Sequence, residues 1–261
     1  MMITYLSRIL LFFYISIICL VYLNYSLKED WFIAGQSNIT WQNDIWDRDC
    51  SMDNLYPKYC NVFVEQFHDI NKEINIESKK HLSDAKTFSL FATYFGIHLS
   101  NVRNKLSRIN LTVTGDGSTN IFCWTELRIK KNEGGRCKDN LLGKFKRQKF
   151  DGFVWWQGET DGINKTDPDT YQKNLEKLIK YIRDFFGNDE MKIIIVAIPG
   201  YWDAGDHESK EYAEIRNRQL IVGRSDPYIK IVNARDYTES ELHPVNYYNE
   251  IAKEAAKVST Q

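Results

Sequence analysis

The stretch from Ile193 to Ile198 is apolar at every position. A strand with one face in water alternates apolar and polar residues, so an unbroken apolar run is typical of a strand that is buried on both faces. Strands of this kind occur in parallel sheets that helices cover on both sides. The stretch therefore predicts an α/β fold in which residues 192–199 form a central strand.

The chain on either side of this stretch alternates strand-like runs with helical patterns. Apolar residues recur at helical spacing between the runs, and Asp167 followed by Pro168 is a typical helix start. The predicted strands are residues 31–34, 109–114, 152–157, 192–199 and 228–234, and the predicted helices are residues 84–107, 168–186, 207–222 and 246–258. No linker divides this part, so we expect one domain at residues 28–261. Its expected fold is a three-layer α/β/α sandwich around a mainly parallel sheet of five strands.

Residues 9–23 are apolar apart from Ser16 and stand outside this alternation. As a helix they would span roughly 25 Å, which is short but sufficient to cross a bilayer. Arg8 precedes the run and Lys28 follows it, so the positive-inside rule places the N-terminus in the cytoplasm and the rest of the chain outside. We expect residues 1–27 to form one N-terminal transmembrane helix. The main alternative is a cleaved signal peptide, although no small-x-small cleavage site is visible, and a buried core helix is the weaker one.

Four cysteines lie outside that apolar run, in two pairs that are close in the sequence: Cys50 with Cys60, and Cys123 with Cys137. An even number of cysteines in local pairs suits disulfide bonds in an oxidising compartment. Four cysteines permit three connectivities, and four free buried thiols are the alternative to all of them. No Cys-x-x-Cys pattern or His/Cys cluster is present, so a zinc site is not expected.

A serine follows the first predicted strand at a tight turn. Residues 35–38 read Gly-Gln-Ser-Asn and come directly after the apolar run 31–34. In open α/β sheets the chemistry lies at the carboxyl ends of the strands. Ser37 is therefore a candidate nucleophile, provided that a base reaches its hydroxyl.

Three further motifs stand in an informative order along the chain. Residues 115–119 read Gly-Asp-Gly-Ser-Thr after a predicted strand, and Trp124 follows them. Residues 155–161 read Trp-Trp-Gln-Gly-Glu-Thr-Asp after another strand, and we expect Trp155 and Trp156 to lie in the core or in a pocket wall. Residues 242–244 read Leu-His-Pro just before the last predicted helix.

Together with Ser37 and its neighbours, these motifs resemble those of the SGNH (GDSL-like) hydrolases. The resemblance is to the branch that contains sialate O-acetylesterases and related carbohydrate acetylesterases, and it extends over roughly residues 31–258. Ser118 replaces the second glycine of a family element, and Ile215, Arg216 and Gln219 match a family helix. The resemblance implies a flavodoxin-like sheet and an esterase that needs no metal or cofactor.

The resemblance also implies a role for each motif residue. Ser37 would attack an ester carbonyl, and His243 would accept its proton and later protonate the leaving sugar hydroxyl. The negative oxygen of the tetrahedral intermediate would be held by the backbone N–H groups of Ser37 and Gly117 and by the side-chain amide of Gln157. A glycine at 117 allows the backbone to approach a ligand without a Cβ in the way.

One position departs from the family pattern. The acid of the triad usually stands three residues before the histidine, and Ser240 occupies that place. A neutral serine cannot stabilise the imidazolium as a carboxylate does, and losing that acid can cost a factor of about 10⁴. The enzyme could instead be a Ser–His dyad, or another carboxylate could substitute. The candidates are Glu239, Glu241, Glu159 and Asp236. Glu159 also fits a structural role in its loop.

These observations predict a membrane-anchored, extracytoplasmic serine esterase that removes O-acetyl groups from a carbohydrate, with sialic acid as one candidate. An alternative is a carbohydrate-binding protein of the same fold that has lost turnover, which Ser240 would explain. A lipase or thioesterase is a weaker alternative, because loop 40–59 is polar and aromatic, as sugar sites often are. The net charge of −1 gives no support for nucleic acid as a partner.

Overall fold

The computed structural model describes residues 11–16, 28–40, 62–70, 73–76, 80–81, 89–103, 108–125, 149–201, 208–238 and 242–261. Eight strands form one sheet in the order β3-β2-β5-β1-β6-β7-β8, and β4 pairs with β2. The strands are β1 (Lys28–Gly35), β2 (Val62–Ile70), β3 (Glu73–Ile76), β4 (Lys80–His81), β5 (Arg108–Gly115), β6 (Gly152–Trp156), β7 (Lys192–Ala197) and β8 (Ile229–Asn233). Neighbours from β2 to β8 are parallel, whereas β3 and β4 run antiparallel to β2.

The predicted α/β fold is confirmed, and all five predicted strands are present as β1, β5, β6, β7 and β8. The predicted number of strands is wrong, because the sheet continues beyond β5 into β2, β3 and β4. The sequence of β2, VFVEQFHDI, mixes apolar and charged residues and lacks the unbroken apolar run by which the central strands were identified. The sheet is therefore mainly parallel but has three more strands than expected.

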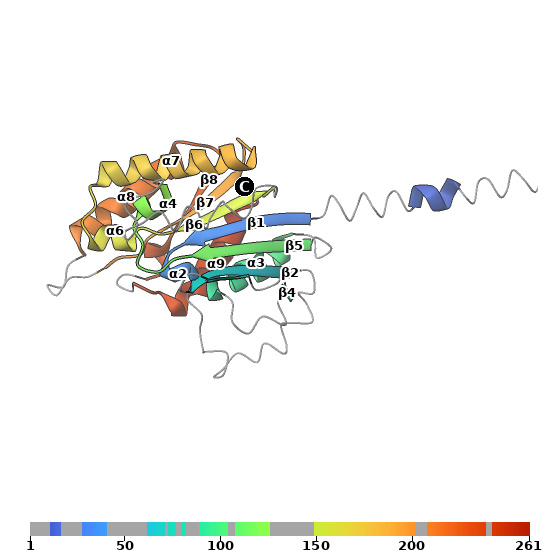
Figure 1. The fold of residues 1–261 in the computed structure, drawn as a ribbon, viewed down its shortest axis with the longest axis horizontal. Coiled ribbons are helices and arrows are strands. Elements are labelled where there is room, and N and C mark those ends of the chain that lie inside the picture. Colours follow the sequence, from blue (N-terminus) through green and yellow to red (C-terminus); the bar gives the residue numbers. More distant parts are fainter. Residues whose placement is uncertain are drawn as a thin grey trace, which may run out of the picture.

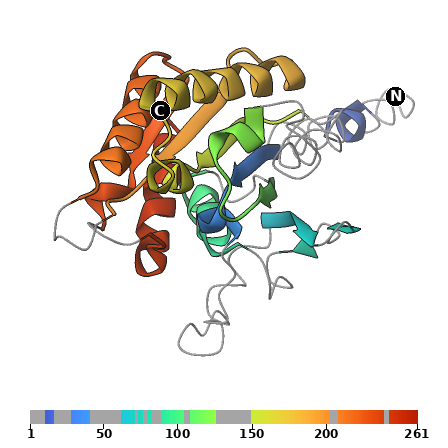
Figure 2. The same ribbon diagram turned by 60° about the vertical axis from the view of Figure 1, so that its left-hand side comes forward.

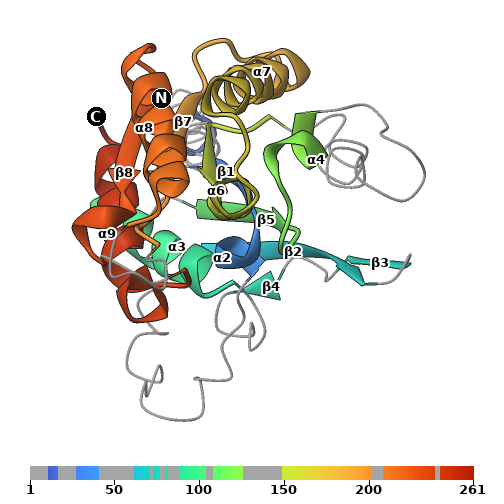
Figure 3. The same cartoon turned by 90° about the vertical axis from the view of Figure 1, so that its left-hand side faces the viewer.

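Helices cover both faces of this sheet, which gives three layers (Figure 1, Figure 2 and Figure 3). One face is covered by α3 (Leu90–Val102) and α9 (Tyr248–Val258). The other is covered by α4 (Ile121–Thr125), α7 (Pro168–Phe186) and α8 (Lys210–Arg224), with α6 (Glu159–Ile163) beside α8. The short elements α2 (Ser37–Thr40), η5 (Ala234–Asp236) and η6 (Val245–Tyr247) lie in the connections.

Side chains of β6 show how the two layers of core arise. Val154 and Trp156 belong to the apolar core under α3 and α9, and Phe153 and Trp155 belong to the core under α7 and α8. This is the alternation expected of a strand buried on both faces. The prediction that both tryptophans lie in the core or a pocket wall is confirmed, since each is fully buried.

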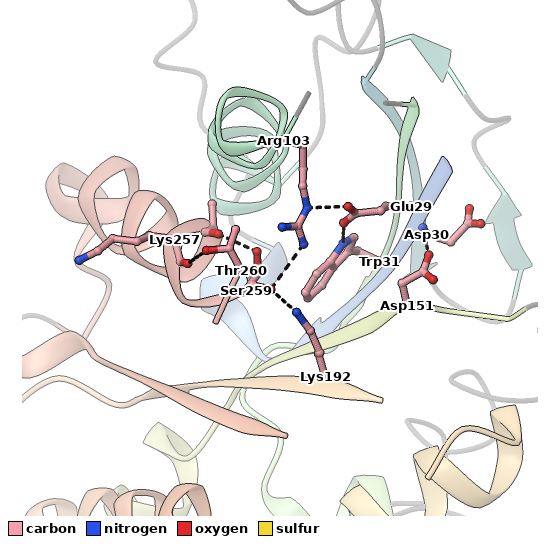
Figure 4. Close-up of polar contacts among 10 residues, drawn as sticks. Glu29, Asp30, Trp31, Arg103, Asp151, Lys192, Lys257, Ser259 and Thr260 are labelled. Atoms are coloured by element: carbon pink, nitrogen blue, oxygen red, sulfur yellow. Dashed lines mark hydrogen bonds and ion pairs between the residues drawn. The ribbon is translucent and has the colours of Figure 1, made fainter. Parts of the chain in front are cut away.

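Polar contacts hold the amino ends of the central strands. The Arg103 guanidinium pairs with the Glu29 carboxylate at 2.5 Å, and Glu29 also accepts a hydrogen bond from the Trp31 indole at 3.0 Å. Lys192 of β7 donates to the backbone carbonyl of Ser259 at 2.8 Å (Figure 4). These contacts fix the start of β1 against the end of α3, and the start of β7 against the C-terminal turn, at the ends of the strands opposite to the predicted site.

Some predictions concern residues beyond those described. Of the apolar run 9–23, the structure describes only residues 11–16, as a helix, and no helix among the described residues is long and apolar enough to span a bilayer. Cys123 is disulfide-bonded, but the other cysteines and nearly all of loop 40–59 fall outside the described part of the chain. The anchor, the boundary at residue 27 and both disulfide pairings stay predictions.

The order of the strands reverses at β1. β1 lies between β5 and β6; the chain leads from β1 to β2 on one side of it, and after β5 it crosses to β6 on the other side. In open α/β sheets such a reversal of strand order opens a crevice at the carboxyl ends of the strands, and ligands bind there. The loops that follow β1, β5 and β6 meet at this place, and they carry three of the four predicted motifs.

Candidate active site

The turn after β1 is fixed from both sides. The backbone carbonyl of Gly35 accepts a hydrogen bond from the Asp116 N–H, and the Gln36 N–H donates to the Trp156 carbonyl, both at 3.1 Å. A Cβ on Gly35 would lie 1.9 Å from that Trp156 oxygen, so only glycine fits. These contacts place Ser37, half-buried, as the first residue of α2 at the carboxyl edge of the sheet.

His243 lies against this serine. Its Nε2 atom is 2.8 Å from Ser37 Oγ, although 206 residues separate the two positions. Burial lowers the pKa of His243 below its usual value of 6.5, because the charged imidazolium is poorly solvated there. A neutral imidazole at hydrogen-bond distance can accept a hydroxyl proton. The structure thus brings Ser37 and His243 into contact, and their catalytic roles stay predictions.

The loop after β5 approaches the same serine. A Cβ built on Gly117 would lie 3.9 Å from the Cβ of Ser37, with no other atom nearer. Ser118 has a φ of 58°, in the left-handed region that glycine adopts most easily. Thr119 accepts a hydrogen bond from the Trp124 indole at 3.1 Å. Ser118 therefore has a backbone conformation that suits the glycine for which it stands in the family that the sequence resembles.

Gln157 links this loop to the end of β6. Its fully buried side-chain amide donates to the Thr119 carbonyl at 3.0 Å and to Asp161 at 2.5 Å, with Gln36 Oε1 at 3.3 Å. An amide nitrogen carries two hydrogens, so both are already engaged. Gln157 holds the two loops together in this structure, and its predicted role as an oxyanion donor would require it to release one of these contacts.

Asp161 ties the loop after β6 to α4. Its carboxylate accepts a hydrogen bond from the Ile121 N–H at 2.9 Å as well as the one from Gln157. Burial raises the pKa of Asp161 to about 6, and the bond from Gln157 opposes part of this rise. The Gln157 carbonyl in turn accepts hydrogen bonds from Gln219 at 2.7 Å and Tyr171 at 2.9 Å. Gln219 of α8, which matches the family helix, therefore supports the loop after β6.

Glu159 is fully buried in the same loop. Its carboxylate accepts a hydrogen bond from Asn38 Nδ2 at 2.5 Å, and burial is the main reason that its pKa rises to about 7. The same Asn38 nitrogen lies 3.2 Å from the backbone carbonyl of Leu242, which precedes His243. Glu159 is thus linked to the histidine segment through Asn38, which fits the structural role considered for it.

Of the four candidates for the acid of the triad, the structure describes Glu159 and Asp236. Glu239, Ser240 and Glu241 lie outside the described residues. Asp236 is described, at the end of η5, where its carboxylate is exposed and accepts a hydrogen bond from Asn233 at 2.8 Å.

Two site residues were not identified from the sequence. Asn38 is part of the Gly-Gln-Ser-Asn motif, but its side chain was assigned no task. Tyr248 donates to Asn38 Oδ1 at 2.6 Å, and no motif includes it. The position of Asn38 directly after the candidate nucleophile was a signal that could have been used, whereas the contact of Tyr248 depends on long-range packing.

Comparisons with known proteins identify a family whose sequence pattern this chain matches. The sequence model of one family matches residues 28–250, and that family is described as carbohydrate esterase, sialic acid-specific acetylesterase. Among curated proteins, none matches the chain by sequence.

Several solved structures share the fold. A carbohydrate acetylesterase from Xanthomonas citri has a TM-score of 0.69 at 15% identity; the match covers 87% of this chain but only 54% of that one. A protein from Arabidopsis thaliana has a TM-score of 0.59 at 17% identity, with 89% and 98% covered. An acetylxylan esterase from Geobacillus stearothermophilus has a TM-score of 0.54 at 13% identity, with 88% and 93% covered. At such identities these likenesses show the fold alone.

Proposed function

Because the chain belongs to the family of carbohydrate esterases described as sialic acid-specific acetylesterases, we propose that it removes O-acetyl groups from a carbohydrate with Ser37 as nucleophile and His243 as general base. Family membership makes the protein a carboxylic ester hydrolase. The observation that carries the proposed mechanism is the 2.8 Å contact between His243 Nε2 and Ser37 Oγ at the carboxyl edge of the sheet.

The proposed reaction has two halves. Ser37 Oγ bonds to the acetyl carbonyl carbon while its proton moves to His243 Nε2. When the tetrahedral intermediate collapses, the bond between the carbonyl carbon and the sugar oxygen breaks, and His243 returns the proton to that oxygen. Water then attacks the acetylated Ser37 with the help of the same imidazole, and acetate leaves.

Charge on the carbonyl oxygen needs donors in both halves. We propose the backbone N–H groups of Ser37 and Gly117 for this role. The proposal is supported by the close approach of Gly117 to Ser37 and by the space that its missing Cβ leaves. Gln157 is a third candidate donor, subject to the release of one present contact.

Acetate release from defined esters tests the proposed function. The full chain is incubated with O-acetylated sialic acid, acetylated xylo-oligosaccharides, p-nitrophenyl acetate and a long-chain p-nitrophenyl ester, and free acetate or nitrophenol is measured. We expect turnover of the acetyl esters and little of the long-chain ester. Faster turnover of the long-chain ester would favour a lipase. Binding of acetylated sugar without acetate release would favour the non-catalytic alternative that Ser240 suggests.

The activity is expected to fall at acidic pH with an inflection below pH 6.5. Burial lowers the pKa of His243 from 6.5, and the imidazole accepts a proton from Ser37 only while it is neutral. As pH falls through this lowered pKa, kcat/KM should therefore decline, and a pH profile with p-nitrophenyl acetate measures it. Glu159 has a pKa of about 7, so the profile of Glu159→Gln is the control. An inflection that disappears in this variant would contradict the assignment to His243.

We also propose an extracytoplasmic location on a membrane anchor. The apolar run 9–23 and the disulfide-bonded Cys123 support it, since disulfides persist in oxidising compartments. Recovery of the chain in the cytoplasmic fraction of its cells would contradict this location.

A further inference from the structure

Asn38 links the turn that carries Ser37 to the segment that carries His243. It directly follows Ser37, and its side chain is fully buried. Its Nδ2 donates to Glu159 Oε1 at 2.5 Å and to the Leu242 carbonyl at 3.2 Å, and its Oδ1 accepts the Tyr248 hydroxyl proton at 2.6 Å. Both amide hydrogens and the carbonyl oxygen are therefore engaged.

The contacts of Asn38 reach both sides of the histidine. Leu242 directly precedes His243, and Tyr248 begins α9, the helix that follows. A single amide thus connects the turn of the nucleophile to the chain just before the imidazole and to the helix just after it. Movement of the 242–248 segment away from Ser37 would break these hydrogen bonds in the interior, where unmet polar groups are costly.

Glu159 fixes the orientation of this amide. Glu159 and the Leu242 carbonyl both present acceptors, so the NH₂ group must face them and the carbonyl oxygen must face the Tyr248 hydroxyl. An amide turned by half a rotation would set its oxygen against two acceptors. The Tyr248 ring is fully buried and packs edge-on against Trp156 at 5.4 Å between ring centroids, so its hydroxyl is also held in place.

We propose that Asn38 is a positioning residue that holds the His243 segment at hydrogen-bond distance from Ser37, and that Glu159 and Tyr248 act through it. The inference rests on the proposed function, because it concerns the geometry of the same two reacting groups. Such positioning matters because a misplacement of about 1 Å can cost roughly a factor of 10² in rate.

Asn38→Ala tests this inference, with Asn110→Ala as the matched control. Asn110 is also buried and also donates to a carboxylate, Asp30 Oδ1 at 2.7 Å, but it lies at the opposite edge of the sheet. We expect Asn38→Ala to lower kcat for p-nitrophenyl acetate about 10²-fold with little change in KM. Asn110→Ala should leave both parameters near those of the wild type.

Variants of the supporting residues separate positioning from general support. Glu159→Gln keeps an acceptor oxygen for Asn38 and should retain kcat within a few-fold, whereas Glu159→Ala should lower it. Adding Glu159→Ala to Asn38→Ala should cause little further loss, because both changes act on one contact. Tyr248→Phe removes only a hydroxyl and should lower kcat several-fold, so it serves if Asn38→Ala does not fold.

The outcomes distinguish this inference from the proposed function. A wild type that releases no acetate, or a Ser37→Ala variant that still does, would overturn the proposed function and the inference with it. An active wild type, an inactive Ser37→Ala variant and equal kcat values for Asn38→Ala and Asn110→Ala would overturn the inference alone. Losses for Asn38→Ala and Glu159→Ala that multiply in the double variant would also overturn it.

Discussion

Acetate release is expected to fall by a factor of at least about 10⁴ when Ser37 is replaced by alanine. The hydroxyl that His243 contacts at 2.8 Å is then absent, and no acyl-enzyme can form. The remaining backbone donors could still stabilise a slow attack by water, which accounts for a small residual rate. Initial rates with p-nitrophenyl acetate and with an acetylated sugar measure the loss.

Ser225→Ala is the control for this variant. Ser225 caps the end of α8, and its hydroxyl donates to the Val222 carbonyl at 2.8 Å, at the sheet edge where β8 begins. The Ser225→Ala substitution also removes one serine hydroxyl but should leave the rate unchanged. A Ser37→Ala variant that is folded and as active as the Ser225→Ala variant would remove Ser37 from the mechanism.

Gly35→Ala is expected to lower the free energy of unfolding by more than about 3 kcal/mol, or to prevent folding. The new Cβ would lie 1.9 Å from the Trp156 carbonyl oxygen and 2.9 Å from a side-chain carbon of Ile39. Neither the backbone of a central strand nor a buried side chain can move away cheaply. Urea unfolding followed by tryptophan fluorescence measures the change.

Gly187→Ala is the control for Gly35→Ala, because it introduces backbone strain without a steric clash. Gly187 ends α7 with a φ of 64°, and no heavy atom lies within 4 Å of its added Cβ. Its replacement should therefore cost only about 1–2 kcal/mol, the usual cost of the left-handed region for a residue with a Cβ. Equal losses for the two variants would show that the turn after β1 tolerates a side chain.

Local pattern was sufficient for most of the architecture. The apolar stretch that begins at Ile193 lies in β7 up to Ala197, where the strand ends, because burial on both faces leaves an apolar run in the sequence. The alternation of strand-like and helical patterns likewise predicted a sheet covered by helices. Val62–Ile70 carries no such run, since it lies towards the edge of the sheet, and its pairing with β5 comes from tertiary contacts. The width of the sheet could not be predicted for this reason.

The sequence was sufficient to predict part of the candidate site. Ser37, Gly117 and His243 stand in motifs that follow or precede identifiable elements, so their meeting at one edge could be expected. Gln157 stands in an equally clear motif, but its amide contacts Thr119 and Asp161, and sequence spacing does not reveal which neighbour a buried amide meets.

Tyr248 and Asn38 illustrate the limit of such reasoning. Their hydrogen bond joins residues 210 positions apart, and neither helix pattern nor motif foretells it. Contacts of this kind depend on how α9 packs against the sheet beside Trp156. They determine the geometry of the site without leaving a periodic signal in the sequence.

Detection of the covalent intermediate tests most directly whether the hydroxyl of Ser37 attacks the acetyl carbonyl. The full chain is mixed with p-nitrophenyl acetate, the reaction is stopped in acid during the first turnovers, and the digested protein is mapped by mass spectrometry. We expect an acetyl group on Ser37 that is absent from the Ser37→Ala variant. An acetyl group on a different side chain, with Ser37 unmodified while acetate is being released, would contradict it.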